Sequence, residues 1–268
     1  MAEEDWAAGW VNTRFKGKAV LIVGGSSGIG LAAAKAFRTE GADVALTGRT
    51  AATLQGAASQ LGVTAIHGDI ADLGECRSSV DQTAAALGRI DVLFVNAGVA
   101  SLARIGKLTP DDWDRCHAVN LRGCIFAIQA ALPHMNDGGA IVTSGSVGSE
   151  MAVPGSLAYA TAKAALRAAT RILAAELAPR RIRVNMIGIG PTKTELYKRG
   201  AAAGKVAATE ARLAAENPLG RMADAAEIAR AVLFLSSDEA SFITGSNFPV
   251  DGGLAEIGRA DVAGAQRK

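Results

Sequence analysis

Short apolar runs with strand character alternate along this chain with Ala- and Leu-rich stretches of helical spacing. Alternation of this kind is typical of parallel strands joined by right-handed helical crossovers, which place helices on both faces of one sheet. We therefore expect an α/β fold built on a doubly wound parallel sheet. The expected strands are 19–23, 44–47, 64–67, 92–96, 140–144, 183–189 and 248–250, and the clearest helical stretches are 31–39, 78–87, 159–177 and 225–235.

No linker interrupts this alternation, so we expect a single domain spanning residues 1–268. A composition of 49% hydrophobic and 20% charged residues is that of a chain that buries a sizeable core. The one long stretch without strand character, 193–217, is polar and Ala-rich. We expect it to form a substrate lid within the domain, with a plain surface insertion as the alternative.

Charge and composition argue against several function classes. The formal net charge of +2, without any block of like charges, gives no basis for nucleic-acid binding, so a small molecule is the expected partner. No apolar run approaches the roughly 18 to 20 residues of a membrane span, and the acidic start does not resemble a signal peptide. A cytoplasmic location is therefore expected. Neither a metal site nor a disulfide is expected from the scattered His67, His117 and His134 or from Cys76, Cys116 and Cys124.

A glycine-rich turn joins the first expected strand to the first expected helix. Its residues are Gly24, Gly25, Ser26, Ser27, Gly28, Ile29 and Gly30. Glycines at such a turn let the backbone approach a pyrophosphate, and the free N–H groups and positive dipole end of the helix favour its negative charge. The G-x-x-x-G-x-G spacing at this position therefore predicts a dinucleotide-binding site.

The end of the second expected strand bears on which dinucleotide binds. An acidic residue there would hydrogen-bond the adenosine ribose and repel a 2′-phosphate, but this sequence has Arg49. Arg49 can pair with a 2′-phosphate through its planar donor fork, and Ser27 can add a hydroxyl. We therefore favour NADP(H) as the cofactor and do not exclude NAD(H); the alternative reading of Arg49 is a solvated surface charge.

Tyr159 and Lys163 lie four residues apart in a helical stretch, so both side chains are expected on one helix face. A free tyrosine is a weak acid, and a nearby ammonium favours its phenolate, so the pair suits proton transfer. Tyr–Lys pairs at this spacing are common on helix surfaces. Whether this pair indicates a catalytic site depends on the residues around it.

Those surroundings resemble the short-chain dehydrogenase/reductase family over roughly residues 16–254. The features occur in the family's order: the glycine turn 24–30, Asn96-Ala97-Gly98, Asn120, Ser146 thirteen residues before Tyr159, and Tyr159 with Lys163. The resemblance implies a Rossmann-type fold and an oxidoreductase that interconverts a ketone and a secondary alcohol by hydride transfer.

The resemblance also implies roles for single residues. Tyr159 would exchange a proton with the substrate oxygen, and Ser146 would hydrogen-bond the substrate carbonyl, where negative charge develops on hydride addition. Lys163 would assist Tyr159 and bind the nicotinamide ribose, while Asn120 would hold a water in a proton relay toward Lys163. The other implied cofactor contacts are Asp69 and Ile70 at the adenine, Asn96, Ala97 and Gly98 on the adenosine side, and Gly190, Thr192 and Thr194 flanking the nicotinamide.

Three residues depart from the family pattern. Val23 stands where a Thr commonly precedes the glycine turn, and Val95 stands where an additional Asn is common. Both changes are expected to remove supporting hydrogen bonds. Ile189 stands where a Pro usually precedes Gly190, and we expect it to loosen the turn beside the nicotinamide because Pro would restrict the backbone.

Two other functions stay open. A ketoacyl carrier-protein reductase needs a basic surface for an acidic carrier, for which Arg180, Arg181 and Arg183 are the candidates. A catalytically silent dinucleotide-binding protein is the other, although it has no need of a tuned proton donor. The resemblance further implies a homotetramer. An apolar substrate pocket is expected from Met151, Leu196 and Tyr197.

Overall fold

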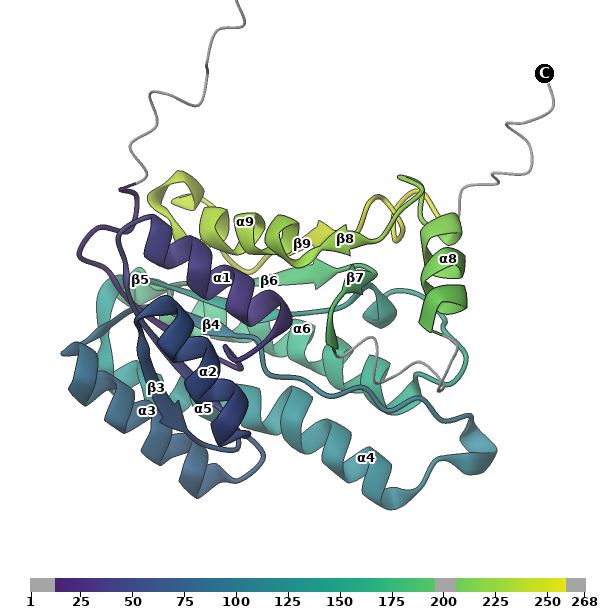
Figure 1. The fold of residues 1–268 in the computed structure, drawn as a ribbon, viewed down its shortest axis with the longest axis horizontal. Coiled ribbons are helices and arrows are strands. Elements are labelled where there is room, and N and C mark those ends of the chain that lie inside the picture. The colour runs from purple at the N-terminus through teal and green to yellow at the C-terminus, as the bar shows by residue number, and fades with distance from the viewer. Residues whose placement is uncertain (1–12, 196–205, 259–268) are drawn as a thin grey trace, which may run out of the picture.

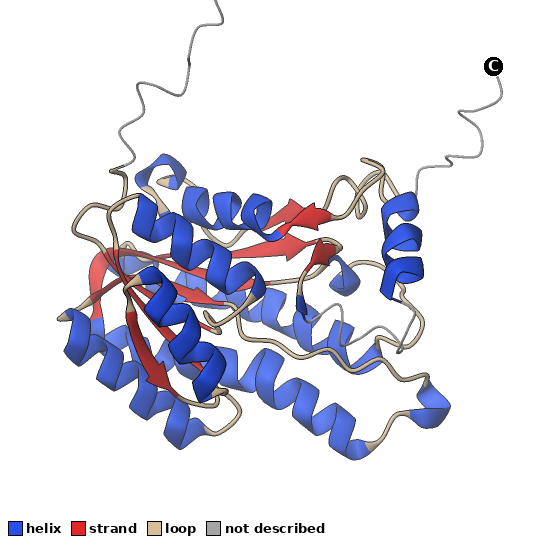
Figure 2. Ribbon diagram, in the orientation of Figure 1, coloured by secondary structure: helices blue, strands red, loops and turns tan. Residues whose placement is uncertain are grey.

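The computed structural model describes residues 13–195 and 206–258, within which seven parallel strands form one sheet (Figure 1, Figure 2). The strand order is β3-β2-β1-β4-β5-β6-β9, so the chain starts near the middle of the sheet and winds outward in both directions. This order confirms the predicted doubly wound parallel sheet. The strands are β1 Ala19–Val23, β2 Asp43–Gly48, β3 Thr64–His67, β4 Ile90–Val95, β5 Met135–Ser144, β6 Arg183–Ile189 and β9 Asn247–Val250.

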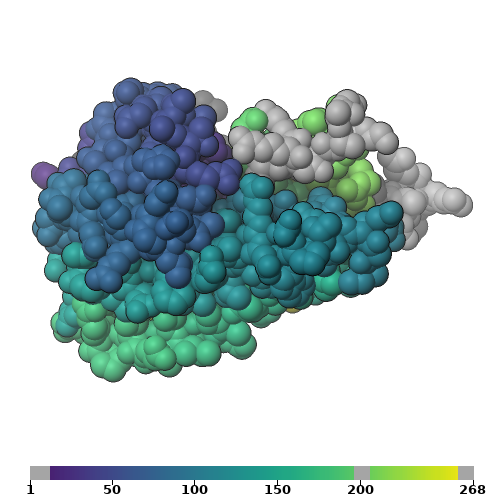
Figure 3. Space-filling view, turned by 90° about the horizontal axis from the view of Figure 1, so that it is seen from below, coloured from purple at the N-terminus to yellow at the C-terminus, as the bar shows by residue number. Residues whose placement is uncertain are grey.

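Helices cover both faces of the sheet because each strand presents apolar side chains alternately to either side. Leu21 and Leu93 belong to one core cluster, whereas their neighbours Ile22 and Phe94 belong to the other. The helices form two layers. The first layer is α1 Gly28–Thr39, α2 Ala51–Leu61 and α9 Ala225–Ser236, and the second is α3 Leu73–Leu87, α5 Cys124–Ala131 and α6 Leu157–Leu177. Figure 3 shows the side of the molecule on which α3 and α5 lie.

One continuous helical stretch leads from solvent into the second layer. Its first part, α4 Pro110–His117, begins at Thr109, whose hydroxyl accepts a hydrogen bond from the Asp112 N–H, as the Thr-Pro-Asp-Asp sequence indicates. A π-helical turn, Ala118–Gly123, then connects α4 to α5. Single π-helical turns are frequent at functional sites, and this one contains the predicted catalytic residue Asn120.

The region of the predicted lid contains one described helix. A two-residue strand β7, Thr192–Lys193, pairs with β8, Ala223–Asp224, and α8, Val206–Glu216, lies between them in sequence. Residues 196–205, which include the predicted pocket residues Leu196 and Tyr197, lie outside the described part of the chain. The lid therefore stays a prediction.

Several absences hold for residues 13–195 and 206–258. No helix there is long and apolar enough to cross a membrane. No group of three or more His, Cys, Asp or Glu side chains there is placed to hold a metal ion. The three cysteines are buried and free.

Candidate active site

The glycine turn between β1 and α1 is held so tightly that side chains would not fit at two of its positions. A Cβ on Gly24 would lie 2.6 Å from the Ala97 nitrogen, and one on Gly30 would lie 2.1 Å from the Gly24 carbonyl oxygen. Gly24 also has φ +83, a left-handed conformation that favours glycine. The turn is therefore a built feature of the fold that brings main chain to the carboxyl end of β1.

The start of α1 is open to an anion. Its N-cap residue Ser27 makes no side-chain capping hydrogen bond, so the Ser27 hydroxyl leaves the N–H groups of the first turn uncapped. N–H groups at a helix start favour a phosphate there. Thr194 lies beside the turn, with its Cγ2 3.3 Å from the position of a Cβ on Gly28.

A cleft of about 600 Å³ opens beside this turn, along the carboxyl ends of the central strands. Open α/β sheets bind their ligands at this edge. Five predicted cofactor residues do not line it, namely Gly30, Tyr159, Lys163, Gly190 and Thr192, and neither do the predicted catalytic residues Asn120 and Ser146. The cleft brings together twelve others, namely Gly24, Ser26, Ser27, Gly28, Ile29, Arg49, Asp69, Ile70, Asn96, Ala97, Gly98 and Thr194.

The side chain of Asn96, which lines the cleft, makes two hydrogen bonds to neighbouring segments. Its side-chain N–H donates to the Gly24 carbonyl at 2.9 Å, and its carbonyl oxygen accepts from the Ser144 hydroxyl at 3.1 Å. The glycine turn is thus tied to the end of β5 through one amide. Sequence reasoning missed Ser144; its place at the carboxyl end of a central strand is the signal that marks it.

Ser146 and Tyr159 flank the same glycine. Ser146 follows β5, and its Oγ accepts the Gly148 N–H at 3.1 Å. The position of a Cβ on Gly148 is 3.4 Å from the Ser146 Oγ and 3.9 Å from Cε1 of Tyr159. Because the Ser146 oxygen already accepts this hydrogen bond, its hydroxyl proton is available to a substrate atom placed between the two side chains.

Lys163 lies one turn further along α6 from Tyr159. Its side chain is buried, with 2% of the residue exposed, and its Nζ donates to the Ser144 carbonyl at 2.7 Å. The same Nζ is 5.9 Å from the centroid of the Tyr159 ring. The fold therefore holds a positive charge close to the phenol.

Asn120 is buried and its amide is fully engaged. The amide nitrogen donates to the carbonyls of Val99, at 2.8 Å, and Cys116, at 2.9 Å, while the amide oxygen accepts the Val99 N–H at 3.1 Å. A Cβ on Gly98 would lie 3.0 Å from that oxygen and 3.8 Å from the Lys163 Nζ. Asn120, Lys163 and the end of β4 therefore meet around Gly98.

The end of β2 places Arg49 at the rim of the cleft. Half of its side chain, 51%, is exposed, and a guanidinium nitrogen lies 4.0 Å from a carboxylate oxygen of Asp69. Its main-chain carbonyl is 2.8 Å from the His67 Nε2. The guanidinium is thus loosely held and accessible from the cleft.

The turn after β6 is fixed in a way that the sequence did not indicate. Ile189 continues β6 opposite Val250, and the Gly190 N–H donates to the Val250 carbonyl at 3.1 Å. A Cβ on Gly190 would lie 2.5 Å from the Asp251 Cα. Pairing with β9 therefore restricts the backbone at Ile189, and our expectation that Ile189 loosens this turn stays a prediction.

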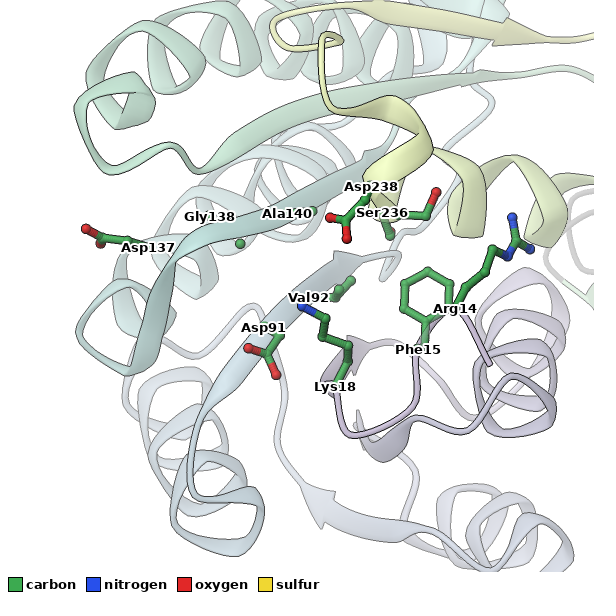
Figure 4. Close-up of a pocket in the computed structure, with 12 residues that line it drawn as sticks. Arg14, Phe15, Lys18, Asp91, Val92, Asp137, Gly138, Ala140, Ser236 and Asp238 are labelled. Carbon is green, nitrogen blue, oxygen red and sulfur yellow. The ribbon is translucent and has the colours of Figure 1, made fainter. Parts of the chain in front are cut away.

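A second, much smaller pocket of about 50 Å³ lies at the opposite edge of the sheet, near the start of β1 and β4 (Figure 4). Lys18, Asp91 and Asp238 are among its lining residues, and the Arg14 side chain extends away from the others toward Glu40, to which it donates. None of the predicted site residues lines this pocket. The large cleft is therefore the candidate cofactor site, and the predicted catalytic residues adjoin it at Gly98, next to Asn120 and Lys163.

A glycine turn at the start of α1, a cleft at the carboxyl edge of a doubly wound sheet and a Tyr–Lys pair beside it define the class of dinucleotide-dependent α/β oxidoreductases. A family model described as enoyl-(acyl carrier protein) reductase matches residues 23–255. D-threitol dehydrogenase from Mycolicibacterium smegmatis is 37% identical over 247 residues, covering 90% of this chain and 94% of that protein.

Solved structures agree with the sequence comparison. A short-chain dehydrogenase/reductase from Serratia marcescens is 37% identical, with a TM-score of 0.84 over 90% of this chain and 99% of that one. A blue fluorescent protein from a metagenomic library, solved in complex with NADPH, is 34% identical, with a TM-score of 0.83 over 90% and 98% of the two chains. The chain belongs to the short-chain dehydrogenase/reductase family, and it is an oxidoreductase of the CH–OH group that uses NAD(P).

Proposed function

We propose that the protein interconverts a ketone and a secondary alcohol with NADP(H), using Tyr159 as the acid/base. The observation that carries this proposal is the placement of Ser146 and Tyr159 on either side of Gly148, with the buried Lys163 ammonium 5.9 Å from the phenol ring. This group of side chains lies at the strand ends next to the glycine turn. A binding module without catalysis has no need of it.

In carbonyl reduction, Tyr159 and Ser146 have different roles. When bound, the nicotinamide supplies the hydride in reduction and accepts it in alcohol oxidation. Tyr159 donates a proton to the substrate oxygen, and the free O–H of Ser146 donates a hydrogen bond to the same oxygen. Both donors act where negative charge develops, which is where a hydrogen bond lowers the barrier most.

Lys163 and Asn120 complete the set. Lys163 has three N–H donors, of which one is used on the Ser144 carbonyl, so two stay available for the nicotinamide ribose and for proton return to Tyr159. The Asn120 amide is committed to Val99 and Cys116. In this proposal the relay water is therefore held by the main chain of the π-helical turn, and the amide keeps that turn in place.

NADP(H) is the cofactor that the exposed guanidinium of Arg49 favours, because a planar donor fork suits a 2′-phosphate. A solved relative in complex with NADPH supports this choice. The test is a fluorescence titration of NADPH and NADH against the wild type, Arg49→Ala and the control Arg77→Ala, an exposed arginine on α3. We expect Arg49→Ala to weaken NADPH binding about tenfold or more, with NADH unchanged. Tighter binding of NADH to the wild type would contradict the assignment.

The proton-transfer role has its own test, the turnover of ketones by Tyr159→Phe. We expect a loss of about 10²-fold to 10⁴-fold in kcat with NADPH binding retained. Turnover equal to that of the wild type would contradict the role of Tyr159. No turnover by the wild type, with cofactor bound, would instead favour the silent binding protein.

A carrier-protein substrate is the second candidate, because the matching family model is described by an acyl carrier protein reaction. The basic cluster expected for it is largely engaged. Arg180 binds the carbonyls of Leu132 and Met135, and Arg183 binds those of Leu235 and Ser237. Docking would thus depend on Arg181, and Arg181→Glu should lower turnover of an acyl-carrier substrate without affecting a small ketone.

We also propose a homotetramer formed through α4 and the second helical layer, which expose apolar side chains. Trp113 on α4, Phe126 on α5 and Leu157 on α6 are 37%, 42% and 42% exposed. Light scattering coupled to gel filtration tests this proposal, and a Phe126→Glu variant should dissociate the assembly. A monomeric wild type would contradict it.

A further inference from the structure

The loop that carries Ser146 is anchored by a carboxylate four residues away. After Ser146 the chain makes a 3-10 turn, Val147–Ser149, and the N–H of Glu150 closes it by donating to the Val147 carbonyl at 2.9 Å. The loop then passes Met151, whose N–H donates to the same carbonyl at 3.0 Å. These contacts are all within the loop, so they shape it but do not place it against the rest of the fold.

The side chain of Glu150 supplies the contacts to the rest of the fold. Its Oε1 accepts a hydrogen bond of 2.5 Å from the amide of Asn247, the first residue of β9, and lies 3.6 Å from a guanidinium nitrogen of Arg167 on α6. The Glu150 side chain is 21% exposed, whereas that of Arg167 is 40% exposed. One carboxylate thus joins the Ser146 loop to a strand and to the catalytic helix.

The contact to α6 falls on the same stripe of the helix as the catalytic pair. Tyr159, Lys163 and Arg167 are spaced four residues apart, and side chains at this spacing lie on neighbouring turns of one face. Moving Arg167 relative to the loop therefore moves Tyr159 relative to Ser146. The contact to β9 depends on the same carboxylate. The other amide atom of Asn247, Oδ1, is buried without a hydrogen-bond partner, so the bond to Glu150 is the one that holds this side chain.

The Glu150 carboxylate determines which way the Asn247 side-chain amide is oriented. An Asn247 amide turned over would place its oxygen against the Glu150 carboxylate, which repels it, so the carboxylate determines the orientation. A buried polar group left without its hydrogen-bond partner destabilises the arrangement that buries it. Removal of the Glu150 carboxylate would leave both amide atoms of Asn247 unpaired. The position of the loop is therefore sensitive to this one side chain.

We propose that Glu150 is a positioning residue for the reaction: through Asn247 and Arg167 it holds the Ser146 hydroxyl in register with the Tyr159 hydroxyl. This inference rests on the proposed role of Ser146 as a donor to the substrate oxygen. It predicts that loss of the carboxylate lowers kcat through Ser146, while the glycine turn and the Arg49 rim, which Glu150 does not contact, continue to bind the cofactor.

The test is a double-mutant cycle of Glu150→Ala with Ser146→Ala, with kcat, KM and NADPH affinity measured for each variant. We expect Glu150→Ala alone to lower kcat about 10-fold to 100-fold, less than the 10²-fold to 10³-fold typical of removing a transition-state donor. NADPH affinity should stay within about twofold. In the Ser146→Ala background the same change should lower kcat by less than about twofold, because two residues that act through one group are not additive.

Two further variants separate positioning from folding. Glu150→Gln keeps an acceptor for Asn247 and should restore most of the lost kcat, while Arg167→Gln should lower kcat and Arg171→Gln, an exposed arginine one turn further along α6, should not. Equal effects of Glu150→Ala in both Ser146 backgrounds would overturn the inference. Wild-type kcat in Ser146→Ala would instead overturn the proposed function of Ser146, so the two failures are distinguishable.

Discussion

The ammonium of Lys163 donates a hydrogen bond of 2.7 Å to the main-chain carbonyl of Ser144, the last residue of β5. This bond joins the middle of α6 to the carboxyl end of a central strand and fixes where the positive charge lies. Because the side chain is only 2% exposed, the charge is largely removed from water. Burial of an ammonium costs free energy unless hydrogen bonds or charges compensate it. We therefore expect the buried Lys163 ammonium to lower the stability of the fold.

Lys163→Met separates this chemical role from a structural one. Met is of similar length and apolar, so we expect the free energy of unfolding to change by no more than about 1 kcal/mol, or Tm by about 4 °C. Activity should fall by at least ~100-fold, because the positive charge beside Tyr159 and the donors to the ribose are lost. Thermal unfolding and initial rates on a ketone measure the two effects. A large fall in Tm with the same specific activity would show that Lys163 is structural.

The fold could be predicted from the sequence because both periodicities are present and short crossovers leave few topologies. Strands 19–23, 64–67 and 183–189 have the predicted bounds. The errors lie where one element passes into another: β5 starts at Met135, five residues before the prediction, since Gly138 and Gly139 carry no strand signal although both lie in the strand. Likewise α1 starts at Gly28, inside the glycine turn, because backbone geometry there overrides helix propensity.

The candidate site could be predicted only in part. Residues such as Gly24, Asn96 and Lys163 were named because a motif carries them, and the structure brings them to one edge of the sheet. Contacts made by the main chain cannot be inferred from residue type. Lys163 binds the carbonyl of Ser144 and Asn120 binds the backbone of Val99, and both contacts depend on how the strands and helices pack.

Gly123, in the π-helical turn, packs against the Ile70 segment, which lines the cleft and is predicted to contact the adenine. A Cβ there would lie 2.3 Å from the Ile70 carbonyl oxygen, and the neighbouring Arg122 donates to the Ala71 carbonyl at 3.0 Å. Gly123→Ala should therefore displace the Ile70 segment, weaken NADPH binding several-fold and destabilise the fold by about 1 to 3 kcal/mol. Titration of the cofactor and thermal unfolding measure both effects.

The matched control is Gly56→Ala, on α2, where a Cβ meets nothing within 4 Å. A glycine in an exposed helix interior is less favourable than alanine by roughly 0.5 to 1 kcal/mol, so this variant should be slightly more stable than the wild type and bind NADPH equally well. If Gly123→Ala behaves like Gly56→Ala, the close contact with Ile70 has no energetic importance.

Cys76 and Cys124 should be inert toward thiol reagents in the folded protein. Burial raises the pKa of the Cys76 thiol to about 11 and also raises that of Cys124. The thiolate is the reactive form, so at pH 8 about one Cys76 in a thousand is reactive even before access is considered. Mass spectrometry after iodoacetamide treatment should show both residues unmodified in native protein and modified in denaturant. Rapid native labelling of either would indicate local opening of α3 or α5.

Glu227 at the start of α9 makes the stability of the fold depend on acid. Both of its oxygens accept from the Arg221 guanidinium at 2.7 Å, and one also accepts the Asp224 N–H at 2.9 Å. These bonds, the arginine's foremost, lower the pKa of Glu227 from 4.5 to about 2. Because the folded pKa is the lower one, the stabilisation is present above about pH 4.5 and is lost as the pH falls toward 2.

Glu227→Gln should therefore lower Tm at pH 7, and the difference from the wild type should shrink steadily below pH 4.5, because the unfolded wild type binds a proton there while the folded carboxylate stays ionised until about pH 2. The effect should be modest, since Arg221 is exposed and Glu227 is partly exposed, so water screens their attraction. Thermal unfolding between pH 7 and pH 3 measures it, with Glu176→Gln, an exposed glutamate on α6, as the control that should show no such trend. A Tm difference that stays constant over this range would mean that Glu227 acts through packing, because a capping hydrogen bond to a carboxylate depends on its charge.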